Sequence, residues 1–271
     1  MNYSKKISKL NINGMSKKII LVAIMSVIAI NANAQFGKML KKTKNIDAGK
    51  KMVKAATLSD EDMATLSLQS VQWMDENNPI VEEGDPYAER FNALIKGLEN
   101  EDGLVLNFKV YRVVDVNAFA TPDGSVRVMA GLMDLMTDDE ILSVIGHEIG
   151  HVKLGHSKKR YQSAYAISAA KEVATANTGA GKILDDKEVG GFVENVLNAQ
   201  FSQSNESASD EYGFKFLVKH NFNYHAMESA FKKLADLSAD GGKGSITSSH
   251  PGSAKRSARA KGWAEKEDQK K

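Results

Sequence analysis

Most of the chain carries apolar residues at helical spacing, and a shorter middle stretch alternates between apolar and polar positions. The alternation over 104–116 predicts a strand, and residues 117–130 predict a hairpin that turns at Pro122-Asp123-Gly124. Helices are predicted from Thr137 onward and over 59–78, 85–100, 158–181, 186–220, 224–239 and 253–267. The pattern therefore indicates an α+β fold that is predominantly helical, with a small sheet.

The first 34 residues resemble a secretory signal peptide. Lys17-Lys18 precede an apolar run, Ile19 to Ile30, and Ala32-Asn33-Ala34 is a small-residue cleavage pattern. This run is shorter than the roughly 20 residues that span a bilayer. We expect cleavage after residue 34 and export to the periplasm, with an uncleaved anchor as the alternative. Met15 directly precedes the leader and is an alternative start.

Residues 35–57 form a predicted basic linker with seven lysines and one acidic residue. It is either a solvated linker or a weak contact with anionic lipid. Residues 58–271 are predicted to form a single domain, large enough to bury its own core. No apolar span of about 20 residues follows the leader, which argues against a membrane-embedded protein.

Charge and cysteine content narrow the class of protein further. Loss of residues 1–34 removes five lysines and no acid, so the formal net charge changes from +2 to −3. With that charge and no base-stacking or phosphate-binding motif, we do not expect nucleic acid as a partner. The chain has no cysteine, so it forms no disulfide and its stability must come from the core.

The segment His147-Glu148-Ile149-Gly150-His151 is the clearest chemical signal. Histidines four residues apart on a helix share one face, so both rings reach one metal ion. Glu148 lies beside them, where it can act on a water bound to that ion. The alternative is a buried helix with two structural histidines, which leaves Glu148 unexplained.

The helix that carries this motif is well defined by its sequence. Thr137 and Glu140 form a predicted capping box at its start. Gly146 and Gly150 each cost about 1 kcal/mol relative to alanine inside a helix. We expect close approach of another backbone or of substrate at these two positions.

A catalytic zinc ion needs three protein ligands and one open position. His156 lies five residues after His151 and points away around the helix, so we interpret it as a C-terminal helix residue. Glu206 and Asp210 are four apart on a predicted helix. We expect Glu206 to bind zinc and Asp210 to accept a hydrogen bond from a ligand histidine. A solvated acidic helix face is the alternative. His220 and His225 are interpreted as structural.

Taken together, the motifs resemble the zinc metallopeptidase family that includes HtpX, the CAAX prenyl proteases, BepA and LoiP, and above all its LoiP-like periplasmic members. The resemblance covers about half the chain, from Asn117 to Arg256. It rests on Asn117-Ala118-Phe119-Ala120, Gly131-Leu132-Met133-Asp134-Leu135-Met136, His147–His151 with Gly155-His156, Asn205-Glu206 with Asp210, and Ser249-His250-Pro251 with Arg256. LoiP-like members are lipoproteins, whereas this chain has no cysteine to carry a lipid.

The resemblance implies a zincin fold of the gluzincin kind, with one zinc on His147, His151 and Glu206 and with Glu148 as general base. It also places a histidine like His250 near the zinc. This histidine would stabilise the oxyanion or bind zinc as a blocking fourth ligand, and the alternative is a loop-terminating histidine. Arg256 would orient the site through a carboxylate.

Zincins place an edge strand beside the active-site cleft, where extended substrate adds main-chain hydrogen bonds. We expect the 117–130 hairpin to supply this edge, with an ordinary structural hairpin as the alternative. In the hairpin, Val126 and Val128 should face one side and Arg127 and Met129 the other.

The sequence therefore predicts an exported, periplasmic zinc endopeptidase, soluble or peripherally membrane-associated. The resemblance implies misfolded or misassembled envelope proteins as substrates and contact with the membrane or with outer-membrane assembly machinery. The alternative is a chaperone-like binding protein with a locked zinc site.

Overall fold

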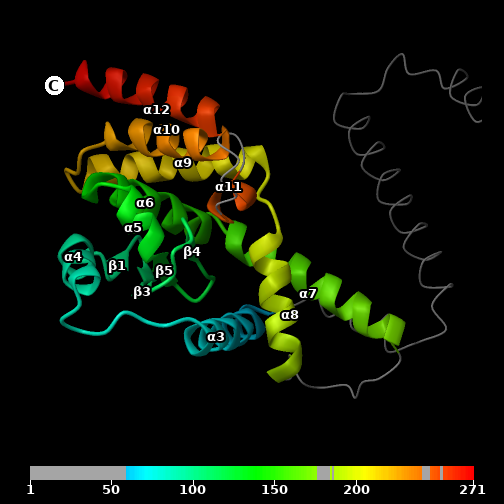
Figure 1. Cartoon of the computed structure of the whole chain (residues 1–271). Helices are drawn as coiled ribbons and strands as arrows, with labels where there is room; N and C mark the ends of the chain where they lie inside the picture. Colours follow the sequence, from blue (N-terminus) through cyan, green and yellow to red (C-terminus); the bar gives the residue numbers. More distant parts are fainter. Residues whose placement is uncertain (1–58, 176–183, 185, 240–244, 251–252) are drawn as a thin grey trace, which may run out of the picture. The chain divides into compact units, whose positions relative to one another are not determined.

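The computed structural model describes residues 59–175, 184, 186–239, 245–250 and 253–271 (Figure 1). The predicted signal peptide and basic linker lie outside these residues. With the labels of Figure 1, the elements are α3 (Asp60–Asn77), α4 (Pro86–Ile95), β1 (Asn100–Glu101), β2 (Leu104–Val105), β3 (Asn107–Tyr111), β4 (Ala118–Ala120), β5 (Ser125–Met129), α5 (Ala130–Leu135), α6 (Asp138–Lys153), α7 (His156–Thr175), α8 (Asp186–Asn198), α9 (Gln203–Lys219), α10 (Ala226–Ala239), α11 (Ser245–Ser249) and α12 (Ser253–Asp268). This is a predominantly helical α+β fold, as the hydrophobic pattern predicts.

The three-stranded sheet is mixed, with β5 in its centre. β3 pairs with β5 in parallel, and β4 pairs with β5 as an antiparallel hairpin. The predicted turn between β4 and β5 is present. Gly124 has φ +89°, and a Cβ there would lie 2.1 Å from the carbonyl oxygen of Val105. Only glycine fits this turn without moving the neighbouring backbone.

Successive residues of the central strand β5 face two different cores, because side chains alternate across a strand. Val126 and Val128 pack into the core that contains α6, α9 and α10. Met129 packs on the opposite face, in the core formed with α3, α7 and α8. Arg127 binds Asp75 of α3. The alternation predicted for the hairpin is confirmed.

Small residues allow α6 and α9 to lie against each other. A Cβ on Gly146 of α6 would come within 2.6 Å of the Phe216 ring and 3.3 Å of Gly213 Cα on α9. A Cβ on Gly150 would lie 3.2 Å from Ser209 Cα. The two glycines in α6 therefore serve the approach of another backbone, as expected from the sequence. In Figure 1, α6 lies between the sheet and the helices α9 and α10, and α12 packs on α10.

Two predicted boundaries near the sheet are wrong. The helix expected to reach residue 100 ends at Ile95, because Gly97 has φ +86° and β1 begins at Asn100. The strand expected over 104–116 ends at Tyr111. At its end, Tyr111 forms an isolated antiparallel bridge with Ile80, in which the Arg112 amide donates to the carbonyl of Pro79.

The long helix predicted over 186–220 is also wrong, because the chain breaks between α8 and α9. Ser202 begins α9 as its N-cap, and its hydroxyl accepts a hydrogen bond from the Asn205 amide. Phe201, just before it, donates its amide to the Ser249 carbonyl. Helix-compatible residues across the break hid this turn from the sequence pattern.

Among the described helices, none combines the length and the apolar composition that crossing a bilayer requires.

Two glycine-to-alanine substitutions, one inside the α6–α9 contact and one outside it, should have opposite effects on stability. Gly146→Ala should lower the free energy of unfolding by about 1–3 kcal/mol, because its methyl group collides with Phe216. Gly262→Ala on α12 meets nothing within 4 Å, so it should raise stability by about 0.5–1 kcal/mol. Urea unfolding of both variants measures this, and a stabilised Gly146→Ala protein would contradict the packing.

The second core contains a buried cation whose partner can be tested. Arg127 is 1% exposed and donates to both carboxylate oxygens of Asp75, at 2.9 and 3.1 Å. Burial alone would raise the pKa of Asp75, but hydrogen bonds from Arg127, Lys109 and Tyr111 outweigh it and hold the pKa at about 2. The carboxylate is therefore ionised in the fold and compensates the charge of Arg127.

Asp75→Asn should cost about 3 kcal/mol of unfolding free energy at neutral pH, because Arg127 loses its anion. The depressed pKa adds stability above about pH 4 that is lost as pH falls towards 2. The difference in unfolding free energy between wild type and Asp75→Asn should therefore decrease as the pH falls from about 4 towards 2. Glu76→Gln, an exposed neighbour, is the control. Equal stability of the two variants at neutral pH would refute the role of Asp75.

Candidate metal centre

Helix α6 positions the motif residues, and its start is set by a capping box. The Thr137 hydroxyl accepts from the Glu140 amide, and the Glu140 carboxylate accepts from the Thr137 amide. The helix is buried along the following turns. His147, Glu148 and His151 are each no more than 3% exposed, so the motif lies inside the protein.

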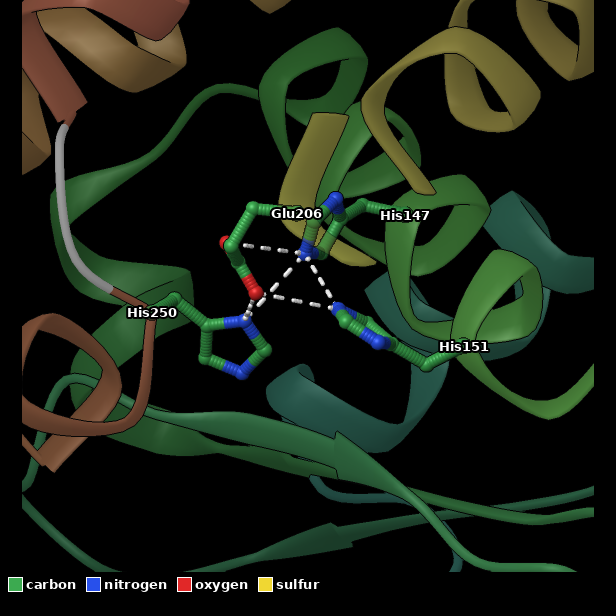
Figure 2. Close-up of side chains that lie close together, drawn as sticks. All are labelled: His147, His151, Glu206 and His250. Carbon is green, nitrogen blue, oxygen red and sulfur yellow. Dashed lines mark hydrogen bonds and ion pairs between the residues drawn. The ribbon is translucent and has the colours of Figure 1, made fainter. Parts of the chain in front are cut away.

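Four side chains from three helical segments converge at one point (Figure 2). His147 and His151 come from α6, Glu206 from α9, and His250 directly follows α11. All four ligand atoms lie within 4.8 Å of one another. His147 Nε2 is 3.0 Å from His151 Nε2 and 3.2 Å from His250 Nδ1. Three imidazole nitrogens and a carboxylate form a donor set that suits zinc.

The carboxylate of Glu206 faces this histidine cluster. Glu206 Oε1 lies 3.3 Å from His151 Nε2 and 3.0 Å from His250 Nδ1. Glu206 Oε2 lies 2.7 Å from Arg256 Nη1, in an ion pair without hydrogen-bond geometry. Glu206 therefore turns Oε1 to the histidines and Oε2 to an arginine.

Asp210 supports the cluster from behind. Its Oδ1 atom lies 2.9 Å from His147 Nδ1, so a proton on Nδ1 leaves Nε2 free to face the cluster. Arg256 donates to Asp210 through Nε and Nη2, and Arg259 donates to its other oxygen. Arg256 also lies 4.1 Å above the centre of the Phe231 ring. The two arginines join α12 to α9 directly behind the histidines.

The pKa shifts of Glu206, Asp210 and His151 favour ionised carboxylates and a neutral imidazole, the forms that suit a metal site. Burial raises the pKa of Glu206, but hydrogen bonds from His151 and His250 outweigh it and hold that pKa far below its usual range. Burial also raises the pKa of Asp210, and the contact with His147 and the charge of Arg256 likewise hold it low. Burial lowers the pKa of His151 well below its usual value, which favours the neutral ring.

Glu148 lies at the edge of the cluster. Its Oε1 atom is 3.5 Å from His250 Nε2 and has no hydrogen-bond partner among the residues the structure describes. A buried carboxylate oxygen of this kind needs a water or a substrate group as its partner. His250 therefore faces Glu206 with one ring nitrogen and Glu148 with the other.

His156 is not a C-terminal helix residue, contrary to the sequence interpretation. Helix α6 ends at Lys153, Gly155 turns the chain with φ +72°, and His156 begins α7. Its Nδ1 atom lies 3.2 Å from His151 Nδ1 and 3.1 Å from the Ser209 hydroxyl. His156 thus contacts the far side of a cluster histidine and is outside the four-residue group.

His220 and His225 are both distant from the cluster, in line with their structural interpretation. His220 Nε2 lies 2.8 Å from Glu101 of β1, and His225 Nε2 lies 3.2 Å from Asp268 of α12. Their ring nitrogens thus serve contacts between elements.

The sequence reasoning missed two neighbours of the cluster. Phe201 stacks on the His151 ring with centroids 3.8 Å apart, and it lies in the break that the helix prediction did not foresee. Arg259 binds Asp210 from α12. The spacing of Arg259, three residues after Arg256 on one helix face, was a usable signal.

Residues 90–264 match peptidase family M48. The chain belongs to peptidase family M48. It is 37% identical to metalloprotease YcaL of Escherichia coli K12 over 88% of this chain and 93% of that protein. It is 39% identical to metalloprotease LoiP of the same strain over 78% and 84%.

A third relative is the putative beta-barrel assembly-enhancing protease of Vibrio cholerae, at 27% identity over 59% of this chain and 34% of that protein. The family resemblance read from the motifs is therefore confirmed. As a member of this peptidase family the chain is a metalloendopeptidase, and zinc is the metal that the family uses. The enzyme class and cofactor expected from the sequence are confirmed.

Proposed function

We propose that this M48 peptidase hydrolyses misfolded or misassembled cell-envelope proteins, with His147, His151 and Glu206 holding one zinc ion and Glu148 as general base. The observation that carries the proposal is the convergence of these ligand atoms around one point beside a carboxylate that lacks a hydrogen bond. Such an arrangement suits metal-assisted hydrolysis of a peptide bond.

Zinc held by His147, His151 and Glu206 would supply polarisation of the scissile carbonyl and a lowered pKa of water, towards about 7. Glu148 takes a proton from the attacking water and passes it to the leaving amine. Its free Oε1 atom supports this role, because that oxygen has no other described hydrogen bond to break. Burial of the cluster excludes bulk water and strengthens each charge interaction within it.

Asp210 and Arg256 keep the ligands in position. A proton on His147 Nδ1 is held by Asp210, which fixes the ring tautomer and raises the basicity of Nε2. Arg256 contacts the carboxylates of both Glu206 and Asp210, so it holds the α9 ligand and the histidine partner in one unit.

Two roles for His250 follow from its two contacts. Its Nε2 atom, 3.5 Å from Glu148, is placed to donate to the developing oxyanion once substrate is bound. Its Nδ1 atom, within the ligand cluster, supports a blocking fourth ligand that α11 must withdraw before turnover. The second contact also favours the rival function, a chaperone-like binding protein with a locked zinc site.

The fold we propose around this centre is a zincin of the gluzincin kind. β4 is an edge strand, because it pairs only with β5 among the described strands, and it lies beside α6. An extended substrate segment would add to β4 by main-chain hydrogen bonds. Edge pairing of this kind supplies affinity with little sequence selectivity, which suits a degrader of unfolded chains.

The cellular setting is part of the same proposal. The leader pattern at 1–34 supports export to the periplasm, where the protein is soluble or peripherally bound to the membrane. The relative named for β-barrel assembly supports contact with outer-membrane assembly machinery. Unfolded or misassembled envelope proteins would then be the accessible substrates.

Glu148→Gln should retain zinc but lose at least about a hundredfold in cleavage rate, because the amide cannot accept the proton of the attacking water. Cleavage of casein and zinc content by atomic absorption measure the two properties together. Glu76→Gln, which removes an exposed carboxylate on α3, should leave both unchanged. Full casein cleavage by Glu148→Gln would remove this residue from its role.

Glu206→Ala should lose bound zinc, because the cluster then lacks its only carboxylate. Metal content per chain is measured after zinc loading and gel filtration, with far-UV circular dichroism as the check on folding. If one zinc per chain remains on the folded variant, the assigned ligand set is wrong.

A chelator separates the peptidase from the rival binding protein. Removal of zinc should abolish casein cleavage, and added zinc should restore it. Suppression of aggregation of a denatured client that survives chelation, with no cleavage in any condition, would favour the chaperone-like protein.

A further inference from the structure

A second concave site lies between α9 and α12, away from the metal centre. It is a groove of about 480 Å³, within the size range of small-ligand pockets. Its apolar lining is formed by Phe214 and Val218 of α9 and by Trp263 of α12. The rings of Phe214 and Trp263 lie 5.6 Å apart. The residues that line the groove are different from those of the metal cluster, although Glu211 directly follows Asp210 on α9.

Lysines rim this groove on both sides: Lys215 and Lys219 on α9, Lys266 on α12, and Lys270 just after the end of α12. Glu211 and Glu267 complete the rim, so the lining holds four cations and two anions. Lys270 pairs with Glu267, and Lys219 pairs with Glu101 and Asp102 just outside the rim.

These rim lysines differ in how freely they can bind an anion. Lys266 has no ion pair with any residue that the structure describes. Lys215 pairs with Glu211 at 2.6 Å, but both side chains are more than half exposed. Exposed pairs of this type contribute little to stability, so an incoming carboxylate can replace them. Lysine stems also extend the apolar surface while their ammonium groups stay in water.

We propose that this groove, defined by Phe214, Val218, Trp263 and the rim lysines, binds polypeptide segments in which apolar side chains alternate with glutamate or aspartate. Apolar side chains fill the floor, and the carboxylates pair with the lysines above it. The chain's own basic segment 35–57, with seven lysines and one acidic residue, would be repelled by this rim.

The position of the groove gives it a role in proteolysis, and this role rests on the proposed peptidase function. Both walls continue to the metal centre: α9 carries Glu206 and Asp210, and α12 carries Arg256 and Arg259. A segment held in the groove is tethered to the same two helices that support the zinc ligands. The groove therefore acts as an exosite that raises the local concentration of acidic, partly apolar substrates.

Trp263 is the natural reporter, because the chain has only one other tryptophan, Trp73. The test uses Trp73→Phe, Glu148→Gln protein, so that emission reports the groove and no peptide is cleaved. The probe is a short synthetic peptide in which leucine and phenylalanine alternate with glutamate. It should shift Trp263 emission saturably, and the affinity should fall as salt rises. The same peptide with lysine in place of glutamate should bind at least about tenfold more weakly.

Charge reversal locates the binding site. Lys215→Glu with Lys266→Glu changes one lysine on each wall and should weaken the peptide Kd about tenfold or more. Lys255→Glu with Lys261→Glu makes the same charge change at exposed positions of α12 outside the groove and should leave Kd within about twofold. Val218→Glu, checked for folding by circular dichroism, should also abolish the emission shift.

Several outcomes overturn the proposal. An unchanged Kd in Lys215→Glu, Lys266→Glu protein would do so, as would equal weakening by the control pair. An emission shift with phosphatidylglycerol vesicles but not with the peptide would assign the groove to a lipid surface. A shift that depends only on protein concentration would assign it to a second copy of the chain. Because binding is measured without cleavage, an inactive metal centre would leave this test intact.

Discussion

The close contact between α6 and α9 is the constraint on which the site depends. The motif on α6 supplies two histidines, and these meet a carboxylate only if α9 approaches to near backbone contact. Glycines on both helices allow this, since a Cβ on Gly213 would lie 2.9 Å from the His147 amide nitrogen. The same approach puts Glu206 beside the rings and Asp210 behind them. The packing of α6 against α9 and the positions of the ligand side chains therefore depend on the same contact.

The charges brought together by this contact are buried, and burial of a charge is costly unless it is paired. Asp210 is fully buried and receives hydrogen bonds from Arg256 and Arg259 while it faces His147. The arginines come from α12, so the last helix of the chain completes a site begun by α6. A buried network of this kind tolerates few alternative arrangements, because each removed partner leaves an uncompensated charge behind. We infer that this buried network is the reason that α6, α9 and α12 hold a single arrangement around the site.

The same helices link the metal centre with the lysine-rimmed groove. Their N-terminal halves carry the buried carboxylates and arginines, and their C-terminal halves carry aromatic residues and exposed lysines. The charged groups of the N-terminal halves are buried and paired, whereas the lysines of the C-terminal halves are solvated. The two ends of the helices therefore suit different partners. The first suits a cation, and the second suits an anionic, partly apolar chain.

Local signals in the sequence were sufficient for the fold class, the β4–β5 turn, the capped start of α6 and the metal-binding motif, because each depends on residues within a few positions of one another. Spacing on one helix also singled out Glu206 with Asp210. The break before α9 escaped prediction, since Phe201 is held there by the Ser249 carbonyl and the His151 ring, which are distant in sequence. His156 was misplaced because the turn at Gly155 separates it from α6 and a new helix begins at His156. Tertiary packing alone decided which atoms meet in the site. His250, for example, turns one ring nitrogen to Glu206 and the other to Glu148. No local pattern in the sequence encodes distances between segments that folding brings together.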